Sequence, residues 1–103
     1  MRSDVEFAIC DAIRTLAVLE FDYNGQHRIV NPYCHGFTRK GLETLRAVQV
    51  DGASLSGGFG HGKLWTIAKI SNLQKTGTTF VPDDPDYNPA DIAMAEIHCC
   101  VAR

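Results

Sequence analysis

A short alternating segment that ends in Asn24-Gly25 constrains the fold of this chain more than any other feature. From Leu19 to Tyr23, apolar residues alternate with acidic ones, which is the period of a half-buried strand. Asn-Gly is the strongest short-range signal for a two-residue hairpin turn, because both residues tolerate a positive φ. The sequence therefore predicts a hairpin whose return strand runs over residues 27–30.

Further short strands are predicted along the chain, separated by turn signals. Pro32 lacks an N–H group, so it should lie at a sheet edge, a bulge or a strand end. Arg39-Lys40-Gly41 predicts a second turn, and residues 45–50 predict a strand whose register the pattern leaves open. A fourth strand is expected over 63–67, and residues 68–73 either continue it or form a short turn.

Three other segments complete the expected fold. The glycine- and serine-rich residues 51–62 predict a long flexible loop, and the acidic, proline-rich residues 82–89 predict a connector. An apolar segment over 95–101 predicts a final strand.

One amphipathic helix is expected before the strands, over residues 4–16. Ser3 and Glu6 have the spacing of a capping box, and apolar residues then recur at helical intervals. A helix this short should cover an open side or end of the strands. The chain, 103 residues long, is therefore expected to be a single mainly β domain over 1–103. Its strands, over about 18–73, should form a small barrel or a strongly bent antiparallel sheet.

Charge and hydropathy limit the classes of partner. The formal net charge is −2, which does not favour sequence-independent electrostatic binding to nucleic acid, although a local basic patch is compatible with this charge. There is no apolar run of about 18 residues to span a membrane, and no secretory apolar region follows Met1. We therefore expect a cytoplasmic protein without a membrane partner.

The four cysteines are Cys10, Cys34, Cys99 and Cys100. In a cytoplasmic chain they should be reduced, and buried inert thiols are the expected state. Neighbouring strand residues point to opposite faces, which argues against a Cys99–Cys100 disulfide. Cys34-His35 and His98-Cys99-Cys100 contain zinc-type ligands, but they lack the paired arms of known zinc sites. The sequence predicts no metal and no cofactor.

One ordered set of segments extends over roughly residues 8–73. Its members are Ala12-Ile13-Arg14, residues 19–25, residues 28–33, Gly36, Arg39, Gly41, residues 45–49, the glycine-serine loop, and residues 63–67 leading to Ile70. In order and spacing this set resembles the WYL domain family. The resemblance implies a small barrel related to the Sm and Src-homology-three (SH3) barrels. It also implies ligand sensing, often of a nucleic acid or nucleotide, in bacterial regulators of DNA damage and phage defence.

Two departures from the family pattern set expectations for this member. The Trp-Tyr-Leu triplet that names the family is missing from its place near residues 44–46. There is no room for the usual winged helix before residue 18. We therefore expect a divergent, stand-alone member whose DNA-binding function, if any, resides in a separate partner protein.

The candidate ligand-binding residues are polar or aromatic groups at strand ends and in loops. They are Tyr23, Arg28, Arg39, Arg46, Gln49, Ser54 and Ser56. Arginine suits bidentate recognition of phosphate or carboxylate, and an aromatic ring can stack on a base. The structural alternative for the arginines is ion pairing with Glu20, Asp22 or Glu43. Trp65 is expected to fill the core, and the glycine-rich loop to be a connection without an anion site.

The leading prediction is a non-enzymatic regulatory module that binds a nucleotide or single-stranded nucleic acid. The alternative is a protein-interaction or oligomerisation module without a small ligand. No enzyme is expected, because the sequence offers no set of nucleophile, base and orienting group. Convergence of the three arginines with Tyr23 on one face favours ligand binding, and scatter favours interaction. An unpaired apolar edge over 97–101 further predicts a homodimer.

Overall fold

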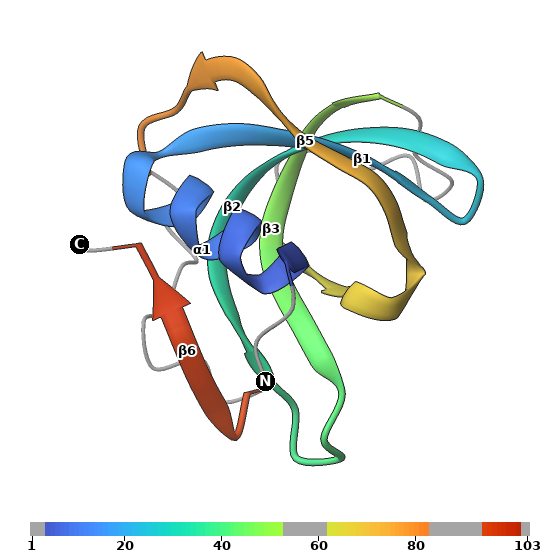
Figure 1. The fold of residues 1–103 in the computed structure, drawn as a ribbon, viewed down its shortest axis with the longest axis vertical. Coiled ribbons are helices and arrows are strands. Elements are labelled where there is room, and N and C mark those ends of the chain that lie inside the picture. Colours follow the sequence, from blue (N-terminus) through green and yellow to red (C-terminus); the bar gives the residue numbers. More distant parts are fainter. Residues whose placement is uncertain (1–3, 53–61, 83–93, 102–103) are drawn as a thin grey trace.

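The computed structural model describes residues 4–52, 62–82 and 94–101. In this part of the chain, one helix precedes an antiparallel sheet of six strands (Figure 1). The elements are α1 (Asp4–Thr15), β1 (Ala17–Tyr23), β2 (Gln26–Phe37), β3 (Glu43–Gly52), β4 (Gly62–Thr66), the 3-10 turn η1 (Ile67–Lys69), β5 (Ile70–Thr79) and β6 (Glu96–Cys100). The strand order is β4-β3-β2-β1-β5, and β6 pairs with β2. The prediction of a mainly β fold with an N-terminal helix is confirmed, and the sheet is not closed, because β4 and β5 at its ends do not pair.

The predicted hairpin is formed by β1 and β2. Asn24 and Gly25 both have positive φ, 53° and 77°, and Tyr23 pairs with Gln26 across the two-residue turn. These are the values that a primed hairpin turn requires. The second predicted turn is also present, since Gly41 has a φ of 81° and donates its N–H to the Thr38 carbonyl at 2.9 Å.

A bend in β2 gives the sheet its shape. On one side β2 pairs with β3 along its length, and on the other it pairs first with β1 and later with β6. The register against β3 shifts between Pro32 and Cys34, which leaves Tyr33 as the extra residue of a bulge. Pro32 therefore lies at a bulge, one of the three positions expected for it. Figure 1 shows β2 turning away from β1 and running down beside β3.

Helix α1 packs where β2 leaves β1. Its buried face carries Ile9, Ala12 and Ile13, each no more than 2% exposed, and the helix contacts β1, β2, β5 and β6. It ends at Thr15, one residue earlier than expected, and Leu16 follows with a φ of 57°. The Ser3 half of the expected capping box lies outside the described residues. The helix thus covers the open side of the bent sheet.

Trp65 lies in the core, as predicted. It is 3% exposed, its indole N–H donates to the Ala47 carbonyl at 3.2 Å, and its ring meets Phe21 edge-on at 5.4 Å. β4 pairs with β3 so that Trp65 faces Leu45. This pairing supplies the register of β3 that the sequence pattern left open.

The last two strands of the described chain are β5 and β6. The segment after β4 makes the short turn η1 and then continues as β5, a ten-residue strand that pairs with β1. The predicted final strand is confirmed as β6, which pairs with β2 through Cys34–Phe37 and has no second partner strand among the described residues. The predicted loop lies largely outside the described residues, as does the 82–89 connector beyond Pro82. No helix in the described ranges has the length and apolar character needed to cross a membrane.

Candidate functional site

The guanidinium of Arg28 is buried between aromatic rings. Arg28 comes from the start of β2, faces Phe21 across the hairpin and is only 5% exposed. Its guanidinium carbon lies 5.6 Å from the centre of the Trp65 ring and 6.0 Å from that of Tyr23. Both distances are within the range of cation–π attraction. The chain therefore holds a permanent positive charge in a largely water-free setting.

The hydrogen bonds of Arg28 reach only neutral acceptors. Its Nη1 donates to Oε1 of Gln49 at 3.4 Å and its Nη2 donates to Oε1 of Gln26 at 3.3 Å. Its Nε is buried and has no hydrogen-bond partner. Both of these bonds are long for hydrogen bonds from nitrogen to oxygen. Burial of a charge is costly unless an opposite charge compensates it, so this cation is poorly compensated within the described chain.

The carboxylates that were considered as partners of Arg28 point elsewhere. Glu20 and Asp22 alternate with Phe21, so they lie on the opposite face of β1. Asp22 accepts a hydrogen bond from the Asn72 amide at 2.8 Å and lies 3.3 Å from His27. Donation from Asn72, followed by that from His27, lowers the pKa of the Asp22 carboxyl below its usual value. Glu43 contacts His35 instead, at 2.7 Å.

Two other predicted residues lie with Arg28. Gln49 is completely buried, accepts from Arg28 and donates to the Asp51 carbonyl at 3.1 Å. Tyr23 is half-buried, its hydroxyl accepts the Thr66 N–H at 3.2 Å, and its ring lies 5.0 Å from that of Trp65. The sequence interpretation missed two members of this group: Gln26, which carries no charge but accepts from Arg28, and Trp65, whose ring lies beside the guanidinium. The hairpin register could have identified Gln26, because it pairs Gln26 with Tyr23.

The other predicted residues do not join Arg28. Arg46 pairs with Cys34 and Leu64, on the face of β3 opposite to Leu45 and Ala47, which are buried in the core. Arg39 is exposed in the turn at the far end of the β2–β3 hairpin. Ser54 and Ser56 lie outside the described residues. The three arginines therefore scatter, and only Arg28 lies beside Tyr23.

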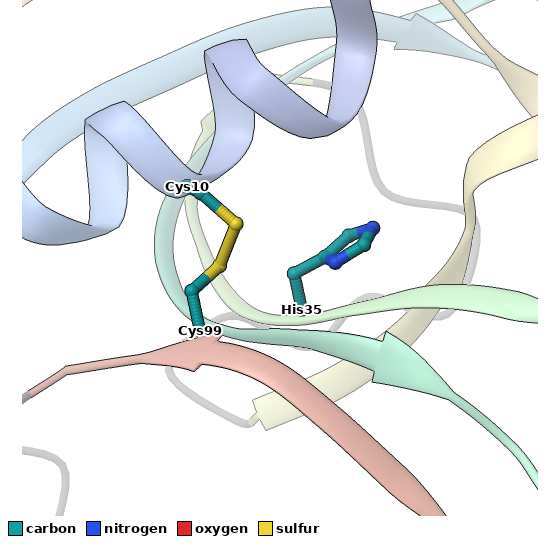
Figure 2. Close-up of side chains that lie close together, drawn as sticks. All are labelled: Cys10, His35 and Cys99. Atoms are coloured by element: carbon teal, nitrogen blue, oxygen red, sulfur yellow. A yellow bond between two sulfur atoms is a disulfide. The ribbon is translucent and has the colours of Figure 1, made fainter. Parts of the chain in front are cut away.

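A second cluster was not predicted. Cys10 of α1 and Cys99 of β6 form a disulfide across a sequence separation of 89, with their Cα atoms 5.8 Å apart (Figure 2). The expectation that all four cysteines are reduced is therefore wrong for this pair. Cys34 and Cys100 are not part of a disulfide, in line with the argument against a Cys99–Cys100 bond. A pocket of about 400 Å³ lies beside the disulfide, lined by Cys10, Ile13, Arg14, Leu16, Cys99 and Cys100.

His35 lies next to the disulfide and is completely buried. It is the cross-strand neighbour of Cys99, and one of its ring nitrogens lies within 4.8 Å of both sulfurs. Its Nε2 contacts Oε2 of Glu43 at 2.7 Å, whereas its Nδ1 is buried without a hydrogen-bond partner. The doublets Cys34-His35 and His98-Cys99 hinted at this cluster. Spacing rules missed it, because the residues meet only through strand pairing.

His98 extends the cluster on the β6 side. Its ring lies 5.4 Å from that of His35, its Nδ1 lies 3.3 Å from Glu6 and its Nε2 lies 2.6 Å from Glu96. Glu6 is only 5% exposed, so this contact places a buried carboxylate beside two imidazoles. Glu6, His35 and His98 make a second group whose ligand-type atoms lie within 4.8 Å of one another.

Comparison with family models, with curated proteins and with solved structures finds no match to this chain. The resemblance to the WYL family stays a prediction.

Proposed function

We propose that this chain is a non-enzymatic regulatory module that binds a nucleotide or short single-stranded nucleic acid through Arg28. The observation that carries the proposal is the buried guanidinium, which has only neutral glutamine acceptors among the described residues. A phosphate oxygen supplies the negative charge that this cation lacks and suits the fork of an arginine.

The surroundings of Arg28 support an anionic, ring-bearing ligand. Tyr23 offers a half-buried aromatic ring, and Gln26 offers a half-buried amide that can exchange its partner. Lys63 projects from the same face of β4 as Trp65, two residues away, which adds a second positive charge to this side of the sheet. A local site of this kind is compatible with a net charge of −2.

We also propose that the chain is a divergent WYL-type domain, with the open bent sheet as the counterpart of the family's small barrel. The order of helix, hairpin and bent second strand supports this relation. Bacterial or phage regulation is the proposed setting, with a separate DNA-binding protein as partner. In the proposed cytoplasmic location, the Cys10–Cys99 disulfide would respond to redox conditions, because reducing systems keep most cytosolic thiols reduced.

Titration of labelled single-stranded DNA, RNA and cyclic oligonucleotides at two salt concentrations tests the binding proposal. A lost hydrogen bond to a charged group costs about 1.5–3 kcal/mol, so Arg28→Gln should weaken binding by about 10–100-fold. Arg39→Gln is the matched control, because it removes the same charge from the exposed turn. Equal binding by the wild type and Arg28→Gln, or no binding by the wild type, rejects the proposal.

The alternative is a protein-interaction or oligomerisation module, and three observations favour it. Arg39 and Arg46 do not converge with Arg28, and single apolar side chains are exposed, with Phe7 at 56% and Val81 at 72%. In addition, β4 and β5 lie at the two ends of the sheet, and each has one edge without a partner strand among the described residues. A wild-type chain that binds none of the nucleic acids but self-associates would support this alternative.

A further inference from the structure

We propose that Cys10, His35 and Cys99 form a redox-gated site for a zinc-like divalent ion, which is occupied when the disulfide is reduced. The three residues come from α1, β2 and β6, and one ligand-type atom of each lies within 4.8 Å of the other two. Figure 2 shows the disulfide and the imidazole side by side. This site is separate from Arg28 and does not depend on the proposed nucleotide binding.

The donor set and its spacing suit zinc. Two thiolates and an imidazole are soft and borderline ligands of the kind that zinc selects. With Zn–S of about 2.3 Å and Zn–N of about 2.0 Å, tetrahedral ligand atoms lie about 3.5–3.8 Å apart. The imidazole nitrogen is thus already near its place, and the main change is separation of the two sulfurs after reduction. Because α1 and β6 carry the sulfurs, a small shift between these two elements is sufficient.

The state of His35 is an independent indication of a ligand. Nε2 faces Oε2 of Glu43 at 2.7 Å, and a carboxylate accepts hydrogen bonds, so this contact suits the tautomer that donates from Nε2 and leaves Nδ1 as an acceptor. Nδ1 is buried without a partner, which is rare and requires an explanation. A carboxylate that holds the far nitrogen of a metal-binding histidine is the usual outer partner of a zinc ligand.

A pocket borders the two sulfur ligands. Cys10 and Cys99 both line this pocket of about 400 Å³, which offers space for a water molecule or a small ligand as the fourth ligand. Three protein ligands and one open position are typical of zinc sites that exchange a ligand.

Occupation of the site requires reduction by a dithiol or a phosphine. With a dithiol, two electrons pass to the Cys10–Cys99 bond, each cysteine gains a proton and the reductant becomes a disulfide. Zn²⁺ then displaces the two thiol protons and binds two thiolates. Hydrogen peroxide reverses the change: two thiolates give the disulfide, the peroxide becomes two hydroxide ions, and Zn²⁺ is released. The disulfide and the metal therefore exclude each other.

The test is a titration of the phosphine-reduced full chain with Co²⁺, which reports thiolate ligation by a charge-transfer band, followed by displacement with Zn²⁺. We expect one ion per chain in the reduced form, at least about 100-fold weaker binding by the oxidised form, and release of Zn²⁺ to a chromogenic chelator on addition of peroxide. A reduced wild type without a thiolate band, or an oxidised form that binds equally well, overturns the proposal without any substitution.

Substitutions identify the ligands. Cys10→Ser, Cys99→Ser and His35→Gln should each abolish the one-to-one site, and Glu43→Gln should weaken it by about 10–100-fold. Cys100→Ser and His98→Gln are matched controls, because each removes the same type of side chain from the same neighbourhood. Circular dichroism checks that each variant folds. Loss of the site in His98→Gln would assign the ion to Glu6, His35 and His98 instead. Loss in Cys100→Ser would show that Cys100 is a ligand. Either result overturns the proposal.

Discussion

At the scale of single residues, the most specific prediction concerns the stability of a variant at Arg28. Its charge is buried beside neutral acceptors, which costs free energy in the absence of an anion. Arg28→Met should therefore leave the melting temperature unchanged or raise it, although binding is lost. This is the pattern of a functional group kept at the expense of stability. Thermal melting of the ligand-free variant measures this effect. A melting temperature below that of the wild type would show that Arg28 has a structural role.

Asp22 should make the acid stability of the fold depend on two surface contacts, with Asn72 and with His27. Its pKa is lowered by the Asn72 amide first and by His27 second, so the folded state favours the carboxylate. A lowered folded pKa adds stability above the unfolded value of about 3.9, and this stability is lost as the pH falls through the folded pKa. Asp22→Asn should reduce stability at pH 7 and flatten its decline in acid. Identical melting profiles of the two proteins between pH 7 and pH 3 would contradict this.

At the scale of elements, Gly36 permits the close approach of β2 and β6. A Cβ added to Gly36 would lie 2.0 Å from the backbone carbonyl oxygen of Glu96, and neither strand can yield without moving backbone. Gly36→Ala should cost about 1–3 kcal/mol of the free energy of unfolding, measured in urea. It should also slow formation of the Cys10–Cys99 disulfide, since β6 carries Cys99. Unchanged stability would mean that β6 does not pair in this register.

Trp65 ties β4 to the first hairpin. It packs edge-on against Phe21 and Tyr23 at 5.4 and 5.0 Å, and almost all of its surface is buried. Trp65→Ala should lower stability by about 3–5 kcal/mol, a large part of the total for a small domain. A melting temperature equal to that of the wild type would place the ring outside the core.

At the scale of the whole molecule, self-association is expected through the unpaired strand edges. Among the described residues, β4 and β5 end the sheet, and β6 has only β2 as a neighbour. Exposed strand edges favour pairing with a second chain. Sedimentation at high micromolar concentration should show a dimer, whereas a strict monomer would reject this expectation.

The features that the sequence predicted correctly depend on local chemistry. Asn24-Gly25 requires positive φ, Pro32 requires a position without a donor, and the apolar spacing of α1 is visible within four turns. The face of Arg28 follows from the hairpin register, which pairs it with the buried Phe21. The face of Arg46 depends on the register of β3, which the sequence pattern left open.

The sulfur cluster could not be predicted, because it arises from contacts between distant segments. His35 and Cys99 become neighbours only when β6 pairs with the second half of β2, and Cys10 joins them only when α1 packs across both. No rule of short spacing covers residues 89 positions apart. Likewise, the burial of Nδ1 and its lack of a partner are properties of the packed molecule and not of the histidine.

The Cys10–Cys99 bond also determines how the molecule responds to mechanical force. It closes a covalent loop that holds nearly the whole sheet, so tension applied to the chain outside Cys10 and Cys99 passes through the disulfide and not through the strands between them. The strands within the loop are shielded from tension, and the oxidised chain behaves almost as an inextensible link. Reduction would transfer the load to the β2–β6 pairing. The redox state of the same two sulfurs thus decides whether an unfolding machine that pulls on the chain from one end meets a covalent cross-link or a sheet that can unfold.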